Sequence, residues 1–140
     1  GILLSMKTHV VKAGVLVDNG KVLIAKRKAG SLAEGTWEFP GGKLEPGETS
    51  NECLIREYKE ELDIGIEVLE KIGEVFHKYD DYDFSVELEL FFIKHIDGEP
   101  VLHVHEEIKW VLPEEVENHN FLGAALPLMG QIIEILKNNA

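Results

Sequence analysis

Apolar residues along the chain fall into short runs and longer periodic runs, which predict strands and helices respectively. Short runs rich in Val, Ile and Phe, separated by glycine-containing turns, are typical of buried strands. The clearest turn is Asp18-Asn19-Gly20-Lys21, because Asn-Gly between two apolar runs is a strong hairpin signal. We therefore expect strands over residues 9–17, 22–27, 37–39, 66–79, 84–95 and 108–112, with Trp110 in the core.

Two segments have the pattern of helices. Thr49 and Glu52 have the spacing of a capping box, so a helix should begin near Thr49 and end near Leu62. Residues 113–117 predict a helical turn, and residues 126–138 predict a closing helix. Strands on both sides of the first helix and a helix at the end indicate an α+β (mixed α/β) fold, with helices on two faces of a central sheet.

Composition and charge narrow the class of protein. The length of 140 residues with 44% hydrophobic and 29% charged residues is that of one globular domain. A formal net charge of −12 repels nucleic-acid backbones and anionic membranes, so we expect neither a nucleic-acid polymer nor a membrane as partner. Cys53, the only cysteine, fits a reducing cytoplasm. We expect the natural protein to begin at Met6, residues 1–5 to be a cloning remnant and residues 6–140 to form one domain.

The first predicted helix carries an acidic stripe beside an apolar one. On a helical wheel the apolar stripe holds Leu54, Ile55, Tyr58 and Leu62, and the acidic stripe holds Glu57, Glu60 and Glu61. Arg56 can pair with Glu60, which leaves Glu57 and Glu61 uncompensated. A hard divalent cation with oxygen ligands would relieve this repulsion.

The three glutamates by themselves are equally typical of a solvated helix face. The preceding loop favours a metal site, because Pro40-Gly41-Gly42 lets the backbone turn sharply and bring its carbonyls close to a ligand. Such a glycine-rich loop before an acidic helix can hold a metal ion beside a phosphate.

Residues 42–64 resemble the Nudix box. That motif reads glycine, five residues, glutamate, seven residues, then arginine-glutamate-apolar-any-glutamate-glutamate-any-glycine-apolar. The matching residues here are Gly42, Glu48, Arg56, Glu57, Glu60, Glu61 and Ile64. Tyr58 stands where an aliphatic residue is usual, and Asp63 stands where glycine is usual. We expect Tyr58 to pack and Asp63 to adopt the left-handed conformation that ends the helix.

Two further segments are similar to the MutT-like branch, the nucleoside triphosphate pyrophosphohydrolases: residues 37–43 and residues 105–110. The resemblance implies the Nudix fold, an α/β/α sandwich with a central mixed sheet and the Nudix loop-helix-loop. It implies an enzyme that uses Mg²⁺, with Mn²⁺ able to substitute, to hydrolyse nucleoside or deoxynucleoside triphosphates to monophosphate and pyrophosphate. The resemblance fits either an enzyme for sanitising the nucleotide pool or a CTP-type pyrophosphohydrolase.

The same resemblance implies roles for single residues. The metal ligands would be the Gly41 carbonyl and the carboxylates of Glu57, Glu60, Glu61 and Glu106, the last favoured over Glu107. Glu57 or Glu106 would be the general base, and Arg56 would orient a glutamate. Phosphate contacts are expected from Arg27 and Lys43, and base contacts from Tyr79 and Phe121. For these four residues a plain surface or core role is the alternative, and for His77, His103 and His105 we expect a surface role.

The last expectations concern recognition of the base and the competing functions. Ala125 aligns with an asparagine that reads the base in relatives that sanitise oxidised guanine nucleotides, so we expect modest base selectivity, with Asn120 as a substitute reader. The competing functions are hydrolysis of diadenosine polyphosphates, to which Tyr82 points, or of another nucleoside diphosphate derivative, and a non-catalytic nucleotide-sensing module. Monomer and homodimer are both open.

Overall fold

The computed structural model describes residues 7–138, so Met6 and the expected remnant lie outside the described residues, as does the side chain of Tyr82. The elements in chain order are β1 Lys7–Asp18, β2 Lys21–Arg27, β3 Trp37–Glu38, β4 Gly41–Lys43, α1 Ser50–Leu62, β5 Gly65–Tyr79, the 3-10 helix η1 Asp80–Tyr82, β6 Phe84–Asp97, β7 His105–Val111, the 3-10 helices η2 Pro113–Asn118 and η3 Gly123–Leu128, and α2 Met129–Asn138.

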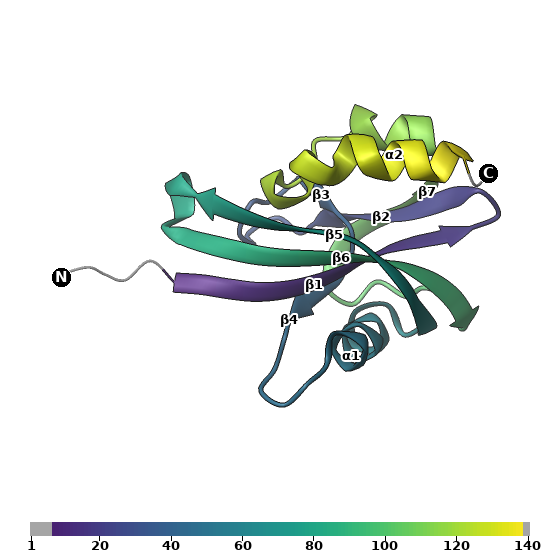
Figure 1. Cartoon of the computed structure of the whole chain (residues 1–140), viewed down its shortest axis with the longest axis horizontal. Helices are drawn as coiled ribbons and strands as arrows, with labels where there is room; N and C mark the ends of the chain where they lie inside the picture. The colour runs from purple at the N-terminus through teal and green to yellow at the C-terminus, as the bar shows by residue number, and fades with distance from the viewer. Residues whose placement is uncertain (1–6, 139–140) are drawn as a thin grey trace.

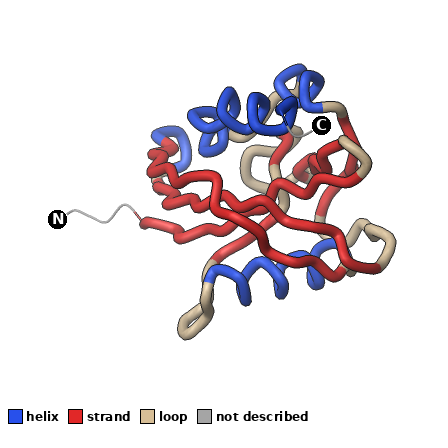
Figure 2. The backbone as a smooth tube through the Cα atoms, turned by 45° about the vertical axis from the view of Figure 1, so that its right-hand side comes forward, coloured by secondary structure: helices blue, strands red, loops and turns tan. Residues whose placement is uncertain are grey.

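The strands form one mixed sheet. Its main path runs β3-β2-β1-β6-β5, while β4 pairs with β1 and β7 pairs with β2. Strands β1 and β6 are parallel over eleven residue pairs, and the other pairings are antiparallel. Helix α1 covers one face, and α2 with η2 and η3 covers the other (Figure 1 and Figure 2). The α/β/α sandwich is confirmed.

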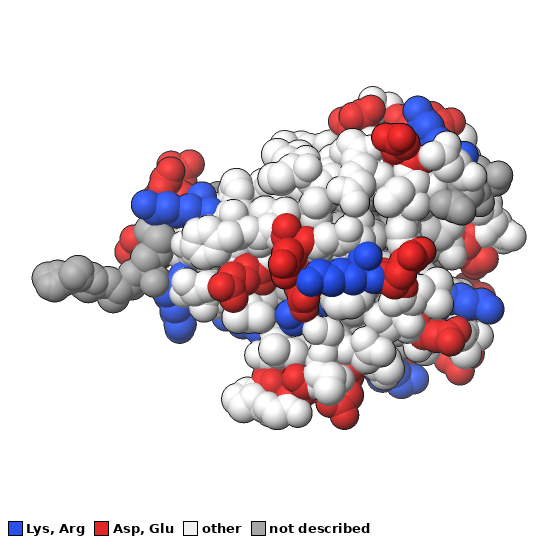
Figure 3. All heavy atoms as spheres, viewed as in Figure 1, with Lys and Arg blue, Asp and Glu red and all other residues white. Residues whose placement is uncertain are grey.

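Each face of the sheet has its own apolar core. On β2, Val22 and Ile24 join the cluster under α2, whereas Leu23 joins the cluster under α1. This alternation is the two-residue period of a strand with both faces covered. From α1 itself, Leu54, Tyr58 and Leu62 are fully buried. Charged side chains of both signs are spread over the visible face, and some of the carboxylates lie near α1 and its preceding loop (Figure 3).

Local signals produced the expected turns and caps. Asn19 and Gly20 both have positive φ, 53° and 74°, as a two-residue hairpin turn matching the strand twist requires. Thr49 caps α1, and the capping box with Glu52 is complete. Asp63 ends α1 in the left-handed conformation with φ 59°. These expectations are confirmed.

Three elements differ from expectation by more than two residues. Residues 41–43 form strand β4, although glycines disfavour strands, because they pair with β1. Strand β7 begins at residue 105 rather than 108. Helix α2 begins at Met129, because Pro127 lacks the N–H of a helix interior and the residues around it form η3.

Two apolar residues are more exposed than expected. Ile55 is 47% exposed, so it does not belong to the buried stripe of α1. Trp110 is half-buried at the margin of the core under α1. Among the described residues, no helix is long and apolar enough to cross a membrane.

A buried hydrogen bond fixes α1 against the sheet. The Tyr58 hydroxyl donates to the Gly14 carbonyl on β1 at 2.9 Å. A Cβ on Gly14 would lie 2.6 Å from Ile93 Cδ1 and 3.0 Å from the same hydroxyl, so only glycine leaves room for this contact. Tyr58 is therefore packed against the sheet, as expected, and its hydrogen bond also sets the distance between α1 and β1.

Candidate active site

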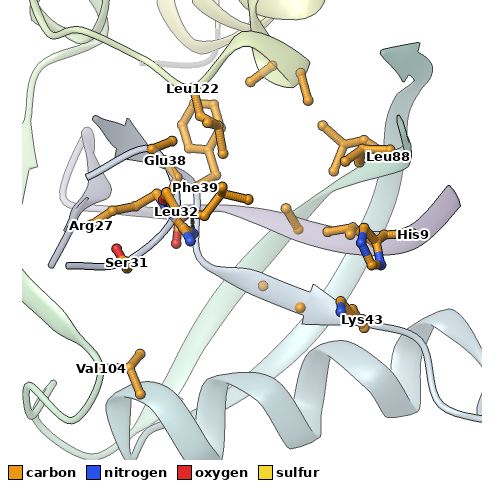
Figure 4. Close-up of a pocket in the computed structure, with 18 of the residues that line it drawn as sticks. His9, Arg27, Ser31, Leu32, Glu38, Phe39, Lys43, Leu88, Val104 and Leu122 are labelled. Atoms are coloured by element: carbon orange, nitrogen blue, oxygen red, sulfur yellow. Dashed lines mark hydrogen bonds and ion pairs between the residues drawn. The ribbon is translucent and has the colours of Figure 1, made fainter. Parts of the chain in front are cut away.

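A cavity of about 540 Å³ opens beside the Nudix box. Most of its lining is apolar and comes from β1, β6, Phe39 and the segment around η3. Its polar side chains are His9, Arg27, Lys28, Ser31, Glu38, Lys43, Glu61, Tyr79 and His105. Figure 4 shows Arg27 and Leu32 on one side of the cavity and His9 and Lys43 on the other. The cavity thus joins an apolar chamber to charged groups.

Arg56 donates hydrogen bonds to several residues of the box. Its Nε donates to Glu48 at 2.5 Å, and its Nη1 donates to Glu57 at 2.7 Å and to Glu60 at 3.3 Å. Its Nη2 donates to the Lys43 carbonyl at 3.0 Å, which ties the helix to β4. The guanidinium holds the pKa of Glu48 at about 2. Our expectation that Glu57 is uncompensated was wrong, because this guanidinium donates hydrogen bonds to three carboxylates at once, Glu57 among them.

The carboxylate of Glu57 lies directly on Gly42. A Cβ at Gly42 would lie 2.2 Å from the carboxyl carbon of Glu57 and 2.3 Å from its Oε2. The glycine of the box is therefore required by close approach rather than by an unusual backbone conformation. Together, Arg56 and Gly42 fix where this carboxylate can lie.

Among Glu57, Glu60 and Glu61, only Glu61 makes no ion pair with a lysine or arginine of residues 7–138. Its side chain is 16% exposed, and its Oε1 is buried without a hydrogen-bond partner. Burial, followed by the neighbouring carboxylates of Glu57 and Glu38, raises the pKa of Glu61 to about 10. A buried acceptor without a donor costs roughly 1–3 kcal/mol, so this oxygen fits a site that a cation would complete.

The donor chemistry here fits a hard divalent ion. The described residues contain no group of three His, Cys, Asp or Glu side chains already gathered for a metal. Mg²⁺ characteristically uses one or two carboxylates together with water and substrate phosphates. Glu57 and Glu61 match that mode of binding.

A second network lies beside Glu61 on the wall of the cavity. His105 is 4% exposed, and its Nε2 lies 2.8 Å from Glu38 Oε2. The other oxygen of Glu38 accepts from Arg27 Nη1 at 2.8 Å. His105 and Arg27, opposing the desolvation of Glu38, keep the pKa of Glu38 below its usual value. The expected surface role of His105 was wrong, because β7 begins early enough to bury it.

Sequence reasoning assigned no role to Glu38 or His105. His105 stood out only by alternating with His103, and its partner Glu38 is 67 residues away in the chain. No local signal connects positions so far apart. By contrast, His103 is exposed, as expected, and His77 packs against Tyr79 with ring centroids 4.3 Å apart.

The other predicted metal ligands lie around the box. Gly41 pairs with Ala13 of β1, and the Glu60 side chain is 60% exposed. Glu106 is the extra residue where the β2–β7 register shifts, and its carboxylate lies 3.4 Å from Lys26 Nζ. Within residues 7–138, no hydrogen bond or ion pair joins Glu106 to the box glutamates. The metal-binding roles of these residues stay predictions.

The predicted substrate contacts separate into two groups. Arg27, Lys43, Tyr79 and Ala125 all line the cavity. Phe121 is 6% exposed and packs behind Phe39, with ring centroids 4.9 Å apart, so it supports the wall without forming it. Asn120 is exposed and is not among the lining residues. A base contact by Phe121 or Asn120 therefore has no support from the geometry.

Comparisons with known proteins agree with this site. A model of the NUDIX domain matches residues 8–129. The CTP pyrophosphohydrolase of Escherichia coli (strain K12) is 34% identical over 124 residues, which cover 89% of this chain and 90% of that protein. A putative 8-oxo-dGTP diphosphatase 2 of Mycobacterium tuberculosis is 29% identical over 136 residues, which cover 96% of this chain and 95% of that protein.

A solved structure is similar along nearly the whole chain. The solution structure of the E. coli ORF135 protein has a TM-score of 0.81 and 32% identity, covering 99% of this chain and 97% of that one. The family model spans the sheet, the box and the cavity, and the relatives match at nearly full length. The chain therefore belongs to the Nudix family and is a MutT-like Nudix hydrolase that acts on nucleotide derivatives.

Proposed function

We propose that this hydrolase converts nucleoside or deoxynucleoside triphosphates to monophosphate and pyrophosphate in a Mg²⁺-dependent reaction. The observation that carries the proposal is the position of Glu61, whose buried oxygen lacks a partner among the described residues, on the wall of a mainly apolar cavity. An apolar chamber suits a nucleoside, and unsatisfied carboxylates suit a cation that accompanies phosphate. Relatives named as triphosphate hydrolases point the same way.

The metal would be held by Glu57 and Glu61, with Glu60, Glu106 and the Gly41 carbonyl as further predicted ligands. A divalent ion bound there neutralises phosphate charge and lowers the pKa of a bound water. We expect Mg²⁺ to serve and Mn²⁺ to substitute, because both accept oxygen ligands.

The side chains themselves place and neutralise the substrate. Arg56 holds Glu57 in position, while Arg27 and Lys43 supply positive charge from two sides of the cavity. Water attacks an inner phosphorus, the P–O bond between the α and β phosphates breaks, and pyrophosphate leaves. The proton from water passes to Glu57 or Glu106, and both assignments are open.

Base selectivity should be modest. Ala125 lines the cavity but can neither donate nor accept through its side chain, and Asn120 lies outside the lining. An apolar contact discriminates by only about 1–3 kcal/mol, whereas a site built to hydrogen-bond its substrate discriminates far more. We expect 8-oxo-dGTP to be preferred over dGTP by much less than in a dedicated sanitising enzyme.

The test is pyrophosphate release from a panel of nucleotides, with and without Mg²⁺. Monophosphate plus pyrophosphate supports the proposal, a dinucleotide cleavage pattern favours the diadenosine polyphosphate alternative, and no turnover favours a sensing module. Glu60→Gln and Glu61→Gln should each lower kcat on the order of 10²-fold with unchanged circular dichroism. Full activity in both folded variants would mean that neither glutamate takes part in the reaction.

The same panel measures the base preference. It should compare kcat/KM for 8-oxo-dGTP, dGTP, dCTP and 5-methyl-dCTP under one condition. A preference of roughly a thousandfold for any one of them would show that another residue reads the base.

A further inference from the structure

Three charged or polar side chains from separate strands meet at one side of the cavity. Arg27 ends β2, Glu38 ends β3 and His105 begins β7. Glu38 lies between the other two, with one carboxylate oxygen 2.8 Å from Arg27 Nη1 and the other 2.8 Å from His105 Nε2. The network therefore joins the three strands β2, β3 and β7 at the wall of the cavity.

Arg27 is held on two of its three guanidinium nitrogens. In addition to the bond from Nη1 to Glu38, its Nε donates to the Leu32 carbonyl at 2.6 Å. Within the described part of the chain, Nη2 makes no hydrogen bond or ion pair. Arg27 lines the cavity, so the guanidinium is fixed in direction while one nitrogen stays available for a ligand (Figure 4).

His105 has a feature that packing alone does not explain. Its Nδ1 is buried and has no hydrogen-bond partner among the described residues. An apolar ring of similar size would fill this position without burying an unpaired nitrogen. Buried polar groups that the fold does not satisfy are a mark of functional sites, and His105 also lines the cavity.

We propose that Arg27, the phosphate contact of the proposed function, is held in place by Glu38 and that His105 is the positioning residue that fixes Glu38; we call these three residues the anion subsite. His105 holds Glu38, and Glu38 in turn orients the guanidinium. A planar guanidinium held in this way can bind phosphate oxygens directionally, which a free side chain does only after losing conformational entropy. This proposal rests on the proposed function, because it takes the substrate to be a triphosphate.

The position of Lys43 supports the assignment. Lys43 lies across the cavity from Arg27 (Figure 4). Glu61, on the same cavity wall as His105, approaches His105 Nε2 to 3.9 Å. A phosphate chain beside the box would thus lie between two cations, with the fixed one on the side of the network.

The experiment uses inorganic tripolyphosphate, which has the phosphates of the substrate but no nucleoside. Calorimetry at saturating Mg²⁺ gives its Kd, and steady-state kinetics with a nucleoside triphosphate give KM and kcat. His105→Phe keeps a ring but removes the donor to Glu38, and it should weaken tripolyphosphate binding and raise KM by about tenfold, with little change in kcat. His105→Gln retains an N–H donor and should recover most of the affinity.

A double-mutant cycle separates positioning from packing. Arg27→Ala should weaken the binding of tripolyphosphate as much as His105→Phe does. The double variant should bind it no more weakly than either single variant, because all three variants lose the same contact. His103→Phe, an exposed histidine two positions upstream, is the matched control and should leave every constant unchanged.

Additive losses in the cycle, or a fall in kcat with unchanged tripolyphosphate affinity, would overturn the subsite. If His105→Phe does not fold, comparing His105→Gln with Arg27→Lys decides the same question. Should the wild type turn over no triphosphate yet bind tripolyphosphate with this dependence on His105, the proposed function fails and the subsite stands. If the wild type turns over triphosphates but His105→Phe binds tripolyphosphate with the wild-type affinity, the subsite fails and the proposed function stands.

Discussion

Replacing Gly42 with alanine tests whether the position of Glu57 controls activity. The new Cβ would lie 2.2 Å from the carboxyl carbon of Glu57, whereas ordinary contact begins at 3.4 Å. The carboxylate must therefore move by the difference, about 1.2 Å. That movement pulls Glu57 away from Arg56 Nη1, now 2.7 Å distant.

The expected cost falls on catalysis more than on folding. Misplacing a catalytic group by about 1 Å can lower the rate on the order of 10²-fold, equal to about 2.7 kcal/mol of transition-state stabilisation. Folding should be affected little, because the clash is with the end of a flexible side chain. Gly41→Ala is the contrasting change, since its Cβ would lie 2.0 Å from the Lys12 carbonyl and 2.6 Å from Ala13 Cα, both backbone atoms.

The assay combines kcat/KM from pyrophosphate release with the melting temperature of each variant. Gly42→Ala should lose activity near the wild-type Tm, whereas Gly41→Ala should lose stability. Gly130→Ala is the control, because a Cβ there meets nothing within 4 Å. A folded Gly42→Ala enzyme within about threefold of wild-type kcat/KM would refute the reasoning, since Glu57 would then tolerate displacement.

Three further predictions concern stability. Without metal, the folded-state pKa of Glu61 is raised from 4.5 to about 10, so the folded state binds the extra proton and stability falls as pH rises through this window. Glu61→Gln should remove that slope in urea titrations with EDTA, and an unchanged slope would assign it to another group. Mg²⁺ at ten times its Kd should stabilise the protein by about 1.4 kcal/mol, and an equal Tm rise in NaCl of matched ionic strength would contradict a specific site. Lys12→Met removes a nearly buried partner of Glu89. Because Lys71 still reaches Glu89 at 2.7 Å, we expect less than the roughly 3–5 kcal/mol of an isolated buried pair, and wild-type stability in urea would mean the pair contributes nothing.

The sequence by itself determined the features that depend on neighbours within a few residues. The Asn19-Gly20 turn, the cap formed by Thr49 and Glu52, and the left-handed Asp63 follow from local conformational preferences and hydrogen bonds. The box spacing likewise places Arg56 beside Glu60, because four residues complete about one helical turn, but it did not predict the hydrogen bond from Arg56 to Glu57. These local rules were sufficient to predict the helix that carries the candidate metal ligands.

Tertiary structure alone decided which distant residues complete the site. Lys12 meets Glu89 across 77 residues, and Glu38 meets His105 across 67. A single register shift between β2 and β7 sets His105 against Glu38 and leaves Glu106 beside Lys26. In a strand, moving the pairing by one residue turns each side chain to the opposite face. The lining of the cavity therefore depends on strand register and packing, which the local pattern of residues does not specify.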